Sequence, residues 1–205
     1  MKLFRLLNRL FFRITNFINY IILLYYKVDY KHGLRINGIL QILGEKKKII
    51  IGDDVIINSG NKIIPIGFPG KTTFWSLGGK ISIGNGCGIS NSTFCSMENI
   101  TIGNHVLLGG GVKIYDTDFH SQNYIIRRDL HNDNNRKSKK IVIGNDVFIG
   151  AGAIILKGSN IGNKSIIGAG SVVTGTIPPN EVWGGNPARF IKRIDRDDYE
   201  NIMDK

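Results

Sequence analysis

Residues 143–158 read IGNDVFIGAGAIILKG, and the hydrophobic spacing of this stretch decides the fold. An aliphatic residue recurs every six positions, and the spacing continues past the stretch, at Ile143, Ile149, Ile155, Ile161, Ile167 and Val173. A period of six belongs neither to a helix nor to an ordinary strand, and internal repeats of this length determine the whole architecture. A residue of modest size precedes each aliphatic by two positions, at Val147, Ala153, Ser159, Ser165 and Ser171. Because side chains alternate along a strand, both members of each pair can point inward.

Glycine follows most of these aliphatic residues, at Gly144, Gly150, Gly162 and Gly168. Glycine suits corners that need a positive φ or a close approach of two backbones, and Asn145 and Asn163 suit the same corners. The pattern predicts a prism with flat sides and tight corners, in which three hexads close one coil of about eighteen residues. Stacked coils would then bury a continuous aliphatic core.

The same register is present earlier in the chain, interrupted by insertions. Its members are Ile36 and Ile42; Ile51, Ile57 and Ile63; Ile83, Ile89 and Cys95; and Ile102, Leu108 and Ile114. One excursion, between Ile63 and Ile83, contains Pro65, Pro69, Phe74 and Trp75, and a larger one spans residues 115–140. Loops that leave a rigid scaffold commonly carry function. We expect Pro178 and Pro179 to end the array, because proline lacks the donor that a strand ladder requires.

Four segments resemble a known family: DTDFH at 116–120, IGNDVFIGAGAIILKG at 143–158, IGAGSVVT at 167–174 and GNPARFIKRI at 185–194. Over roughly residues 31–194 the chain resembles the hexapeptide-repeat acyltransferases, in the branch of galactoside and of capsule or lipopolysaccharide O-acetyltransferases. The resemblance implies an all-β solenoid, a left-handed parallel β-helix, that uses acetyl-CoA and no metal. We divide the chain into a basic amphipathic helical segment (1–30), the β-helix (31–180) with its excursion (115–140), and a tail (181–205).

The N-terminal segment has an unusual charge pattern. Residues 1–28 contain no acid and five basic residues, Lys2, Arg5, Arg9, Arg13 and Lys27. Apolar residues recur at helical spacing, at Leu3, Leu6, Leu7, Leu10, Ile14, Phe17, Ile18 and Ile21. The uncharged part, residues 14–26, is shorter than the roughly twenty residues of a bilayer span. Two compatible hypotheses remain: a cap on the open end of the prism, or an interfacial helix on anionic lipid with Arg5, Arg9 and Arg13 on its polar face.

Composition limits the other possibilities. The 205 residues are 42% hydrophobic, which agrees with one domain and a sizeable core. We expect Cys87 and Cys95 to be buried thiols in a reducing compartment. No secretory cleavage pattern is present, so we predict a cytoplasmic protein. Peripheral contact with the inner face of the membrane is a second option. The net charge of +11 comes without a nucleic-acid motif and favours phosphates, an anionic membrane or an anionic saccharide carrier as partners.

Acetyl transfer to a sugar hydroxyl needs a general base, because a hydroxyl is a poor nucleophile at neutral pH. Four histidines are present, and His120 alone lies in the DTDFH motif. By resemblance, His120 would take the hydroxyl proton and return it to the departing thiolate. His120 has no partner at metal-ligand spacing. Asp118 and Asp116 are candidates to orient the imidazole of His120 through a hydrogen bond. We also expect Asp116 near the acceptor. For both residues, a structural role in ordering the loop is an equal alternative.

The resemblance also places the two substrates. Pantetheine would lie near Ala151, Ala169 and Thr174, and coenzyme phosphates near Arg189 and Lys192.

Ser90, Asn91 and Ser92 match a segment that contacts the acceptor, although a role at a solenoid corner is equally open. Phe148 stands where relatives commonly carry Trp, which removes an indole donor from one wall of the acceptor pocket.

Relatives form trimers with sites between neighbouring prisms, so we predict a homotrimer and a saccharide acceptor. N-acetylation of an amino sugar, or a non-catalytic saccharide-binding solenoid, remain as alternatives.

Overall fold

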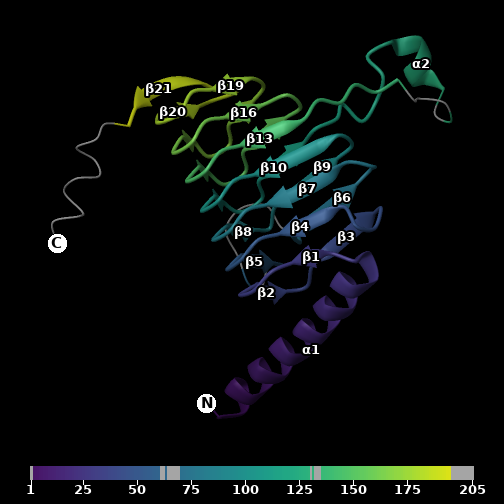
Figure 1. Cartoon of the computed structure of the whole chain (residues 1–205), viewed down its shortest axis with the longest axis vertical. Coiled ribbons are helices and arrows are strands. Elements are labelled where there is room, and N and C mark those ends of the chain that lie inside the picture. The colour runs from purple at the N-terminus through teal and green to yellow at the C-terminus, as the bar shows by residue number, and fades with distance from the viewer. Residues whose placement is uncertain (1, 61–62, 64–69, 130, 132–134, 195–205) are drawn as a thin grey trace.

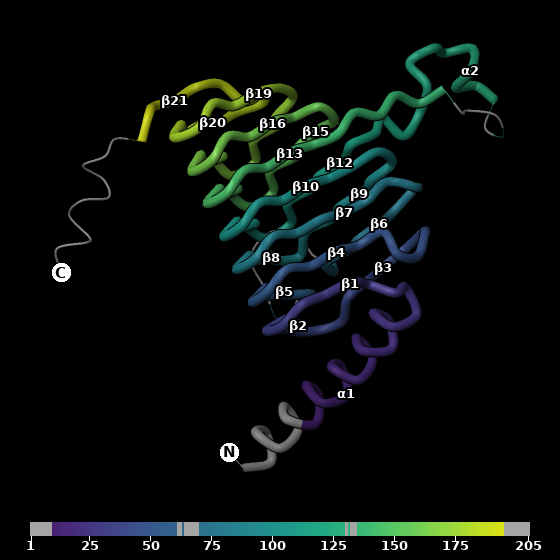
Figure 2. Tube along the Cα trace, in the orientation of Figure 1, coloured from purple at the N-terminus to yellow at the C-terminus, as the bar shows by residue number. Residues whose placement is uncertain are grey.

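The computed structural model describes residues 2–60, 63, 70–129, 131 and 135–194, with side chains from residue 10 onward. In this part of the chain a long helix, α1 (Lys2–Tyr26), precedes a three-sided solenoid of stacked parallel strands (Figure 1). A short helix, α2 (Tyr124–Arg128), lies in an excursion that projects from the side of the solenoid. The Cα trace shows the coils stacked in chain order, from the N-terminal helix to the C-terminal hairpin (Figure 2).

Three sheets form the sides of the prism, and we name them A, B and C. Sheet A holds β1 (Asp29–Tyr30), β4 (Ile49–Ile51), β7 (Lys80–Ile83), β10 (Asn99–Ile102), β13 (Ile141–Ile143), β16 (Asn160–Ile161) and β19 (Thr176–Ile177). Sheet B holds β2 (Arg35–Gly38), β5 (Ile56–Ser59), β8 (Gly88–Ser90), β11 (Leu107–Leu108), β14 (Phe148–Ile149), β17 (Ile166–Ile167), β20 (Glu181–Gly184) and β21 (Arg189–Arg193). Sheet C holds β3 (Gln41–Gly44), β6 (Thr73–Ser76), β9 (Thr93–Ser96), β12 (Lys113–Tyr115), β15 (Ile154–Leu156) and β18 (Val172–Val173).

The register confirms the coil predicted from the repeats. Ile143 pairs with Ile161, Ile149 with Ile167, and Ile155 with Val173, so successive coils are three hexads apart. These aliphatic residues are almost completely buried along the prism axis. The core is therefore built by stacking, and no coil buries its own apolar face alone.

The serines that precede the aliphatic residues also point inward, as predicted. Ser159, Ser165 and Ser171 are buried, and each hydroxyl is satisfied by the backbone. Ser159 Oγ donates to Leu156 O over 2.7 Å, Ser165 Oγ donates to Pro178 O over 2.7 Å, and Ser171 Oγ accepts from Gly185 N over 3.1 Å. Buried hydroxyls are tolerated when they are hydrogen-bonded in this way.

The corners between sheets A and B are joined by a ladder of asparagines. Each Asn side-chain oxygen accepts from the backbone N–H of the coil before it, in the pairs Asn85 with Asp53, Asn104 with Asn85, Asn145 with Asn104, and Asn163 with Asn145. A Cβ on Gly144 would lie 2.3 Å from Asn163 Oδ1, which confirms the predicted close approach. Of the two reasons that we gave for glycine at these corners, close approach therefore applies, and the positive φ of the corner lies on Asp146 (58°) and Lys164 (61°).

Two slots of the core are filled differently from the prediction. In sheet C, the core position after Ile57 is occupied by Phe74 and not by Ile63. In the next coil, the same position is occupied by Phe94 and not by Cys95. The two phenyl rings stack with centroids 4.9 Å apart and are fully buried. The register shifted because the segment after Ile57 is an inserted excursion and the segment after Ile89 is one residue shorter than a hexad.

Cys95 pairs with Trp75 and Tyr115 on the outer face of sheet C, yet it is fully buried, as is Cys87. The predicted burial of both thiols is therefore confirmed, although Cys95 does not face the prism axis. Burial raises the pKa of Cys87, and burial, with a smaller contribution from the negative charge of Asp116, raises the pKa of Cys95 to about 12.

The solenoid continues past residue 180. β20 pairs in parallel with β17, and β21 then folds back antiparallel onto β20, so the two prolines do not end sheet B. Their rings stand in a corner, where no ladder donor is required. Pro65, Pro69 and residues 195–205 lie outside the described residues.

Candidate active site

The excursion between β12 and β13 is fixed at its base by Asp116. This residue is fully buried, and its carboxylate accepts three hydrogen bonds, from Ser96 Oγ (2.8 Å), Met97 N (2.6 Å) and Glu98 N (3.0 Å). Its backbone oxygen also accepts from Lys139 N (2.9 Å), so the two ends of the excursion are joined. Asp116 therefore orders the loop, and its expected place beside the acceptor is wrong because the carboxylate is fully buried.

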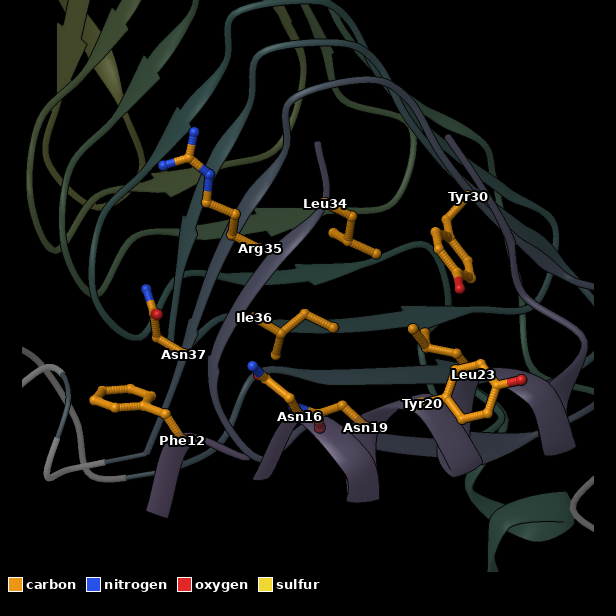
Figure 3. Close-up of a pocket in the computed structure, with 10 residues that line it drawn as sticks. All are labelled: Phe12, Asn16, Asn19, Tyr20, Leu23, Tyr30, Leu34, Arg35, Ile36 and Asn37. Atoms are coloured by element: carbon orange, nitrogen blue, oxygen red, sulfur yellow. The ribbon is translucent and has the colours of Figure 1, made fainter. Parts of the chain in front are cut away.

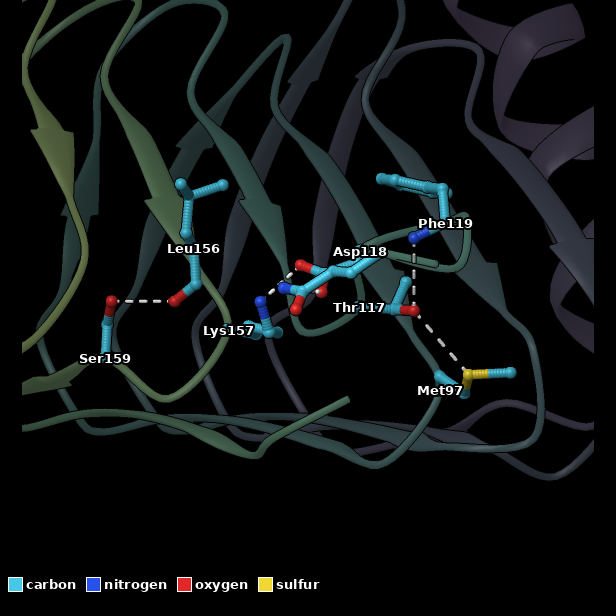
Figure 4. A network of polar contacts seen from close by, with 8 residues as sticks. Met97, Thr117, Asp118, Phe119, Leu156, Lys157 and Ser159 are labelled. Carbon is cyan, nitrogen blue, oxygen red and sulfur yellow. Dashed lines mark hydrogen bonds and ion pairs between the residues drawn. The ribbon is translucent and has the colours of Figure 1, made fainter. Parts of the chain in front are cut away.

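Aromatic packing fixes the next part of the loop. Phe119, with φ of 65°, places its ring 5.3 Å from that of Tyr115 and 6.3 Å from that of Trp75. Its backbone N–H reaches Thr117 Oγ1 (3.4 Å), whose hydroxyl in turn contacts Met97 Sδ (3.6 Å) (Figure 4). The residue before His120 is therefore held against the outer face of sheet C.

Asp118 forms an ion pair with Lys157, which follows β15 (Figure 4). Gln122 Nε2 also donates to Asp118 Oδ2 (3.3 Å), and Asp118 N donates to Lys137 O (3.0 Å). The described partners of Asp118 thus tie the loop to the solenoid. The sequence analysis did not predict that Lys157 and Gln122 contact Asp118. The available signal was the position of Lys157, a cation directly after the strand residues of a hexad.

The four histidines fall into two groups. His105 has φ of 56° and lies against Gly86 at a corner of the solenoid, and His32 lies at the equivalent corner of the first coil, between β1 and β2. His120 and His131 lie in the excursion, and both are exposed. All four histidines are exposed, and His120 is the one that directly follows Phe119, whose ring packs on the outer face of sheet C.

Ala151 and Ala169 stack on the corner between sheets B and C. A Cβ on Gly150 would lie 2.5 Å from Ala169 N, so adjacent coils approach closely here. Ala169 is exposed and Ala151 is half-buried, which leaves this edge narrow and accessible.

Thr174 and Arg189 line one small cavity of about 130 Å³, together with Trp183 and Ala188. Lys192 is exposed on β21, opposite Val182. The structure thus brings Thr174 and Arg189 together near the C-terminal end of the solenoid.

The three predicted acceptor residues of the neighbouring coil lie at a corner. Ser92 is fully buried and its hydroxyl donates to Ser90 O (3.1 Å), so the prediction that it contacts a ligand is wrong. Asn91 is 4% exposed, has φ of 45°, and its Oδ1 accepts from Gly60 N (2.8 Å). Ser90 is half-buried, with Oγ accepting from Asn58 Nδ2 (3.3 Å). The corner role that the sequence left open accounts for Asn91 and Ser92.

Phe148 is 44% exposed on the outer face of sheet B, beside Leu107 of the preceding coil. Phe148, Ala151 and Ala169 therefore lie on or near the edge between sheets B and C, whereas Lys157, Thr174 and the base of the excursion lie on the edge between C and A. The two edges are separated by the width of sheet C, on the order of 15 Å. In the described residues, no three His, Cys, Asp or Glu side chains are grouped as metal ligands.

Residues 140–175 match the family model described as bacterial transferase hexapeptide (six repeats). This chain thus carries the hexapeptide repeat of that model over these residues. It is 38% identical over 133 residues to the galactoside O-acetyltransferase of Escherichia coli (strain K12), which covers 64% of this chain and 63% of that protein. The chain therefore spans less than two thirds of the length of this curated relative.

Solved structures share the fold. A hexapeptide-repeat acetyltransferase from Vibrio cholerae O1 biovar eltor, complexed with acetyl-CoA, is 28% identical with a TM-score of 0.53, over 80% of this chain and 71% of that one. A galactoside acetyltransferase in complex with coenzyme A is 26% identical with a TM-score of 0.56, over 83% of this chain and 66% of that one. The left-handed parallel β-helix that the family resemblance implied is confirmed.

Proposed function

We propose that this chain transfers an acetyl group from acetyl-CoA to a hydroxyl of a saccharide. The observation that carries the proposal is His120: an exposed imidazole that directly follows an anchored aromatic residue, on the largest excursion of a hexapeptide-repeat solenoid. The match to a galactoside O-acetyltransferase supports a saccharide hydroxyl as the acceptor. We place the reaction in the cytoplasm, where acetyl-CoA is available.

In the proposed mechanism His120 acts as the general base. The acceptor oxygen attacks the thioester carbonyl carbon while His120 takes the hydroxyl proton. The tetrahedral intermediate collapses, the carbon–sulfur bond breaks, and the protonated imidazole returns its proton to the thiolate of coenzyme A. Asp118 is proposed to position the loop that carries His120, and its carboxylate is itself held by Lys157.

Acetyl-CoA is proposed to lie along the accessible edge at Ala151 and Ala169, where small side chains let pantetheine approach the backbone. Thr174 and Arg189 share a cavity, and Arg189 and Lys192 are exposed cations close to the C-terminal end of the solenoid. A guanidinium binds phosphate in a bidentate manner, and a lysine adds a point charge. On the acceptor side, Ser90 and Phe148 remain the accessible candidates.

We propose a homotrimer with cyclic symmetry, and the positions of these residues support it. The proposed base and the edge at Ala151 and Ala169 lie on opposite sides of sheet C, so we propose that a neighbouring prism completes a site that uses both. In a closed ring with heterologous contacts, the C–A edge of one prism meets the B–C edge of the next at every interface. Sedimentation equilibrium should give three times the mass of one chain, and a monomer would contradict this arrangement.

The direct test is release of the coenzyme A thiol from acetyl-CoA in the presence of sugars, amino sugars and lipid-linked saccharides. His120→Ala should lower turnover roughly a hundredfold or more while binding of coenzyme A persists. His131→Ala, an exposed histidine of the same excursion, is the matched control and should retain turnover. Full activity in the His120 variant would remove the proposed base. Release only with amino sugars would make the chain an N-acetyltransferase, and coenzyme A binding without release in any mixture would contradict the transferase.

A further inference from the structure

Helix α1 presents two faces with different chemistry. Thr15, Asn19 and Leu23, spaced four apart, are buried against the first coil. Asn19 Nδ2 donates to Gly38 O (2.8 Å) and Asn19 Oδ1 accepts from Leu40 N (3.0 Å), which satisfies backbone groups at the open end of the solenoid. This inner face therefore covers the base of the prism, and it leaves the opposite face turned away from the protein (Figure 1).

The outer face of α1 is apolar and exposed. Its residues alternate in steps of four and three, and their exposed fractions are 53% for Leu10, 51% for Ile14, 65% for Phe17, 48% for Ile21 and 64% for Leu24. Large aliphatic and aromatic side chains exposed in one contiguous stripe mark an interaction surface. No helix in the described residues is both long enough and apolar enough to span a bilayer.

A polar edge separates the two faces. Arg13, Asn16 and Tyr20 fall along this edge by helical spacing, and all three are exposed. A hollow of about 440 Å³ opens beside the edge, lined by Phe12, Asn16, Tyr20, Leu23, Arg35 and others (Figure 3). The apolar stripe is thus bordered by the cation of Arg13 and the amphipathic ring of Tyr20, as in helices that lie in a membrane interface.

We propose that the outer face of α1 docks on the surface of an anionic phospholipid bilayer. The stripe would enter the boundary between headgroups and acyl chains, with Arg13 at the level of the lipid phosphates. The charge of the segment selects this partner over a second copy of α1. Residues 1–28 hold five basic residues and no acid, so two such helices would bring like charges together without any counter-charge, whereas lipid phosphates neutralise them.

The test is co-sedimentation of the full chain with vesicles of phosphatidylcholine alone and of phosphatidylcholine mixed with phosphatidylglycerol. The wild type should sediment with the mixed vesicles and much less with the neutral ones. The double variant Phe17→Asn with Leu24→Asn should lose at least about tenfold in affinity, because two large apolar side chains no longer enter the lipid. Arg13→Gln should weaken binding severalfold and reduce its dependence on salt.

The matched control is Ile56→Asn with Leu107→Asn, which removes exposed apolar residues from sheet B and should leave vesicle binding unchanged. Both double variants should keep the thermal unfolding transition of the wild type, since none of these side chains faces the core. A wild type that stays in the supernatant, or a helix variant that binds like the wild type, would overturn the proposal. So would a helix variant whose only change is a smaller oligomer. The assay contains no coenzyme or saccharide, so its outcome is independent of the proposed catalysis.

Discussion

The regular array of residues 141–177 and the excursion of residues 115–140 are held in place by different means. In the array, every hexad has a buried aliphatic residue at the same position and pairs with the next coil through the same backbone hydrogen bonds. Many equivalent contacts therefore fix the position of each strand. The excursion returns to the solenoid through a few side-chain contacts, mainly those of Asp116, Asp118 and Phe119. The contrast teaches that substitutions in the array should act on stability, and substitutions at the contacts of the excursion should act on catalysis.

The first prediction tests how strictly the array is determined. Gly150→Ala should destabilise the fold by about 1–3 kcal/mol, because its Cβ would lie 2.5 Å from the backbone nitrogen of Ala169. Gly168→Ala occupies the same corner in the last full coil, where the nearest atom is 3.5 Å away, and should change stability by less than about 1 kcal/mol. Chemical denaturation of both variants measures the difference, and equal stabilities would refute the close-approach account.

The second prediction addresses the contacts of the excursion. Lys157→Met removes the ion pair with Asp118 and should lower kcat about tenfold, since the loop that carries His120 loses one tether. Both charges are partly exposed, so the free energy of unfolding should fall by less than about 1 kcal/mol. Lys80→Met, an exposed lysine at the start of β7, is the control. A Lys157 variant that loses stability while keeping kcat would reverse the contrast between the two regions.

The array was predicted well from the sequence because its signal is redundant. Six aliphatic residues recur at intervals of six positions, and only one strand register is consistent with all of them. The same reasoning failed at Ile63 and Cys95, where an insertion and a shortened hexad moved Phe74 and Phe94 into the core. A single displaced residue carries no periodic signal, so the error was invisible before the strand pairings were known.

The site was predicted less evenly. The motif around His120 identified an exposed and anchored position, but the roles of Asp116 and Ser92 depend on burial, which sequence spacing does not specify. Lys157 escaped attention because the ion pair joins residues far apart in the sequence. Contacts between a loop and a scaffold of this kind depend on the path of the loop.

The third and smallest prediction concerns alkaline pH. The Cys95 thiol lies where the excursion begins over sheet C, and its pKa is raised by burial to about 12 from 9.0. Between these values the folded chain keeps a proton that the unfolded chain releases, so stability should fall as the pH rises from about 9. Cys95→Ala should flatten this decline, measured by denaturation at several pH values, more than Cys87→Ala does. If the Cys95 variant loses stability with pH as steeply as the wild type, the alkaline sensitivity arises from groups other than Cys95.

The measurement that tests the account most directly is subunit mixing. His120→Ala removes the proposed base, and Ala169→Trp blocks the proposed pantetheine edge, so each variant alone should be inactive. If each site joins the excursion of one chain to the edge of its neighbour, random mixed trimers should recover about a quarter of the wild-type rate. Mixed trimers that form and remain inactive would contradict a catalytic site shared between neighbouring prisms.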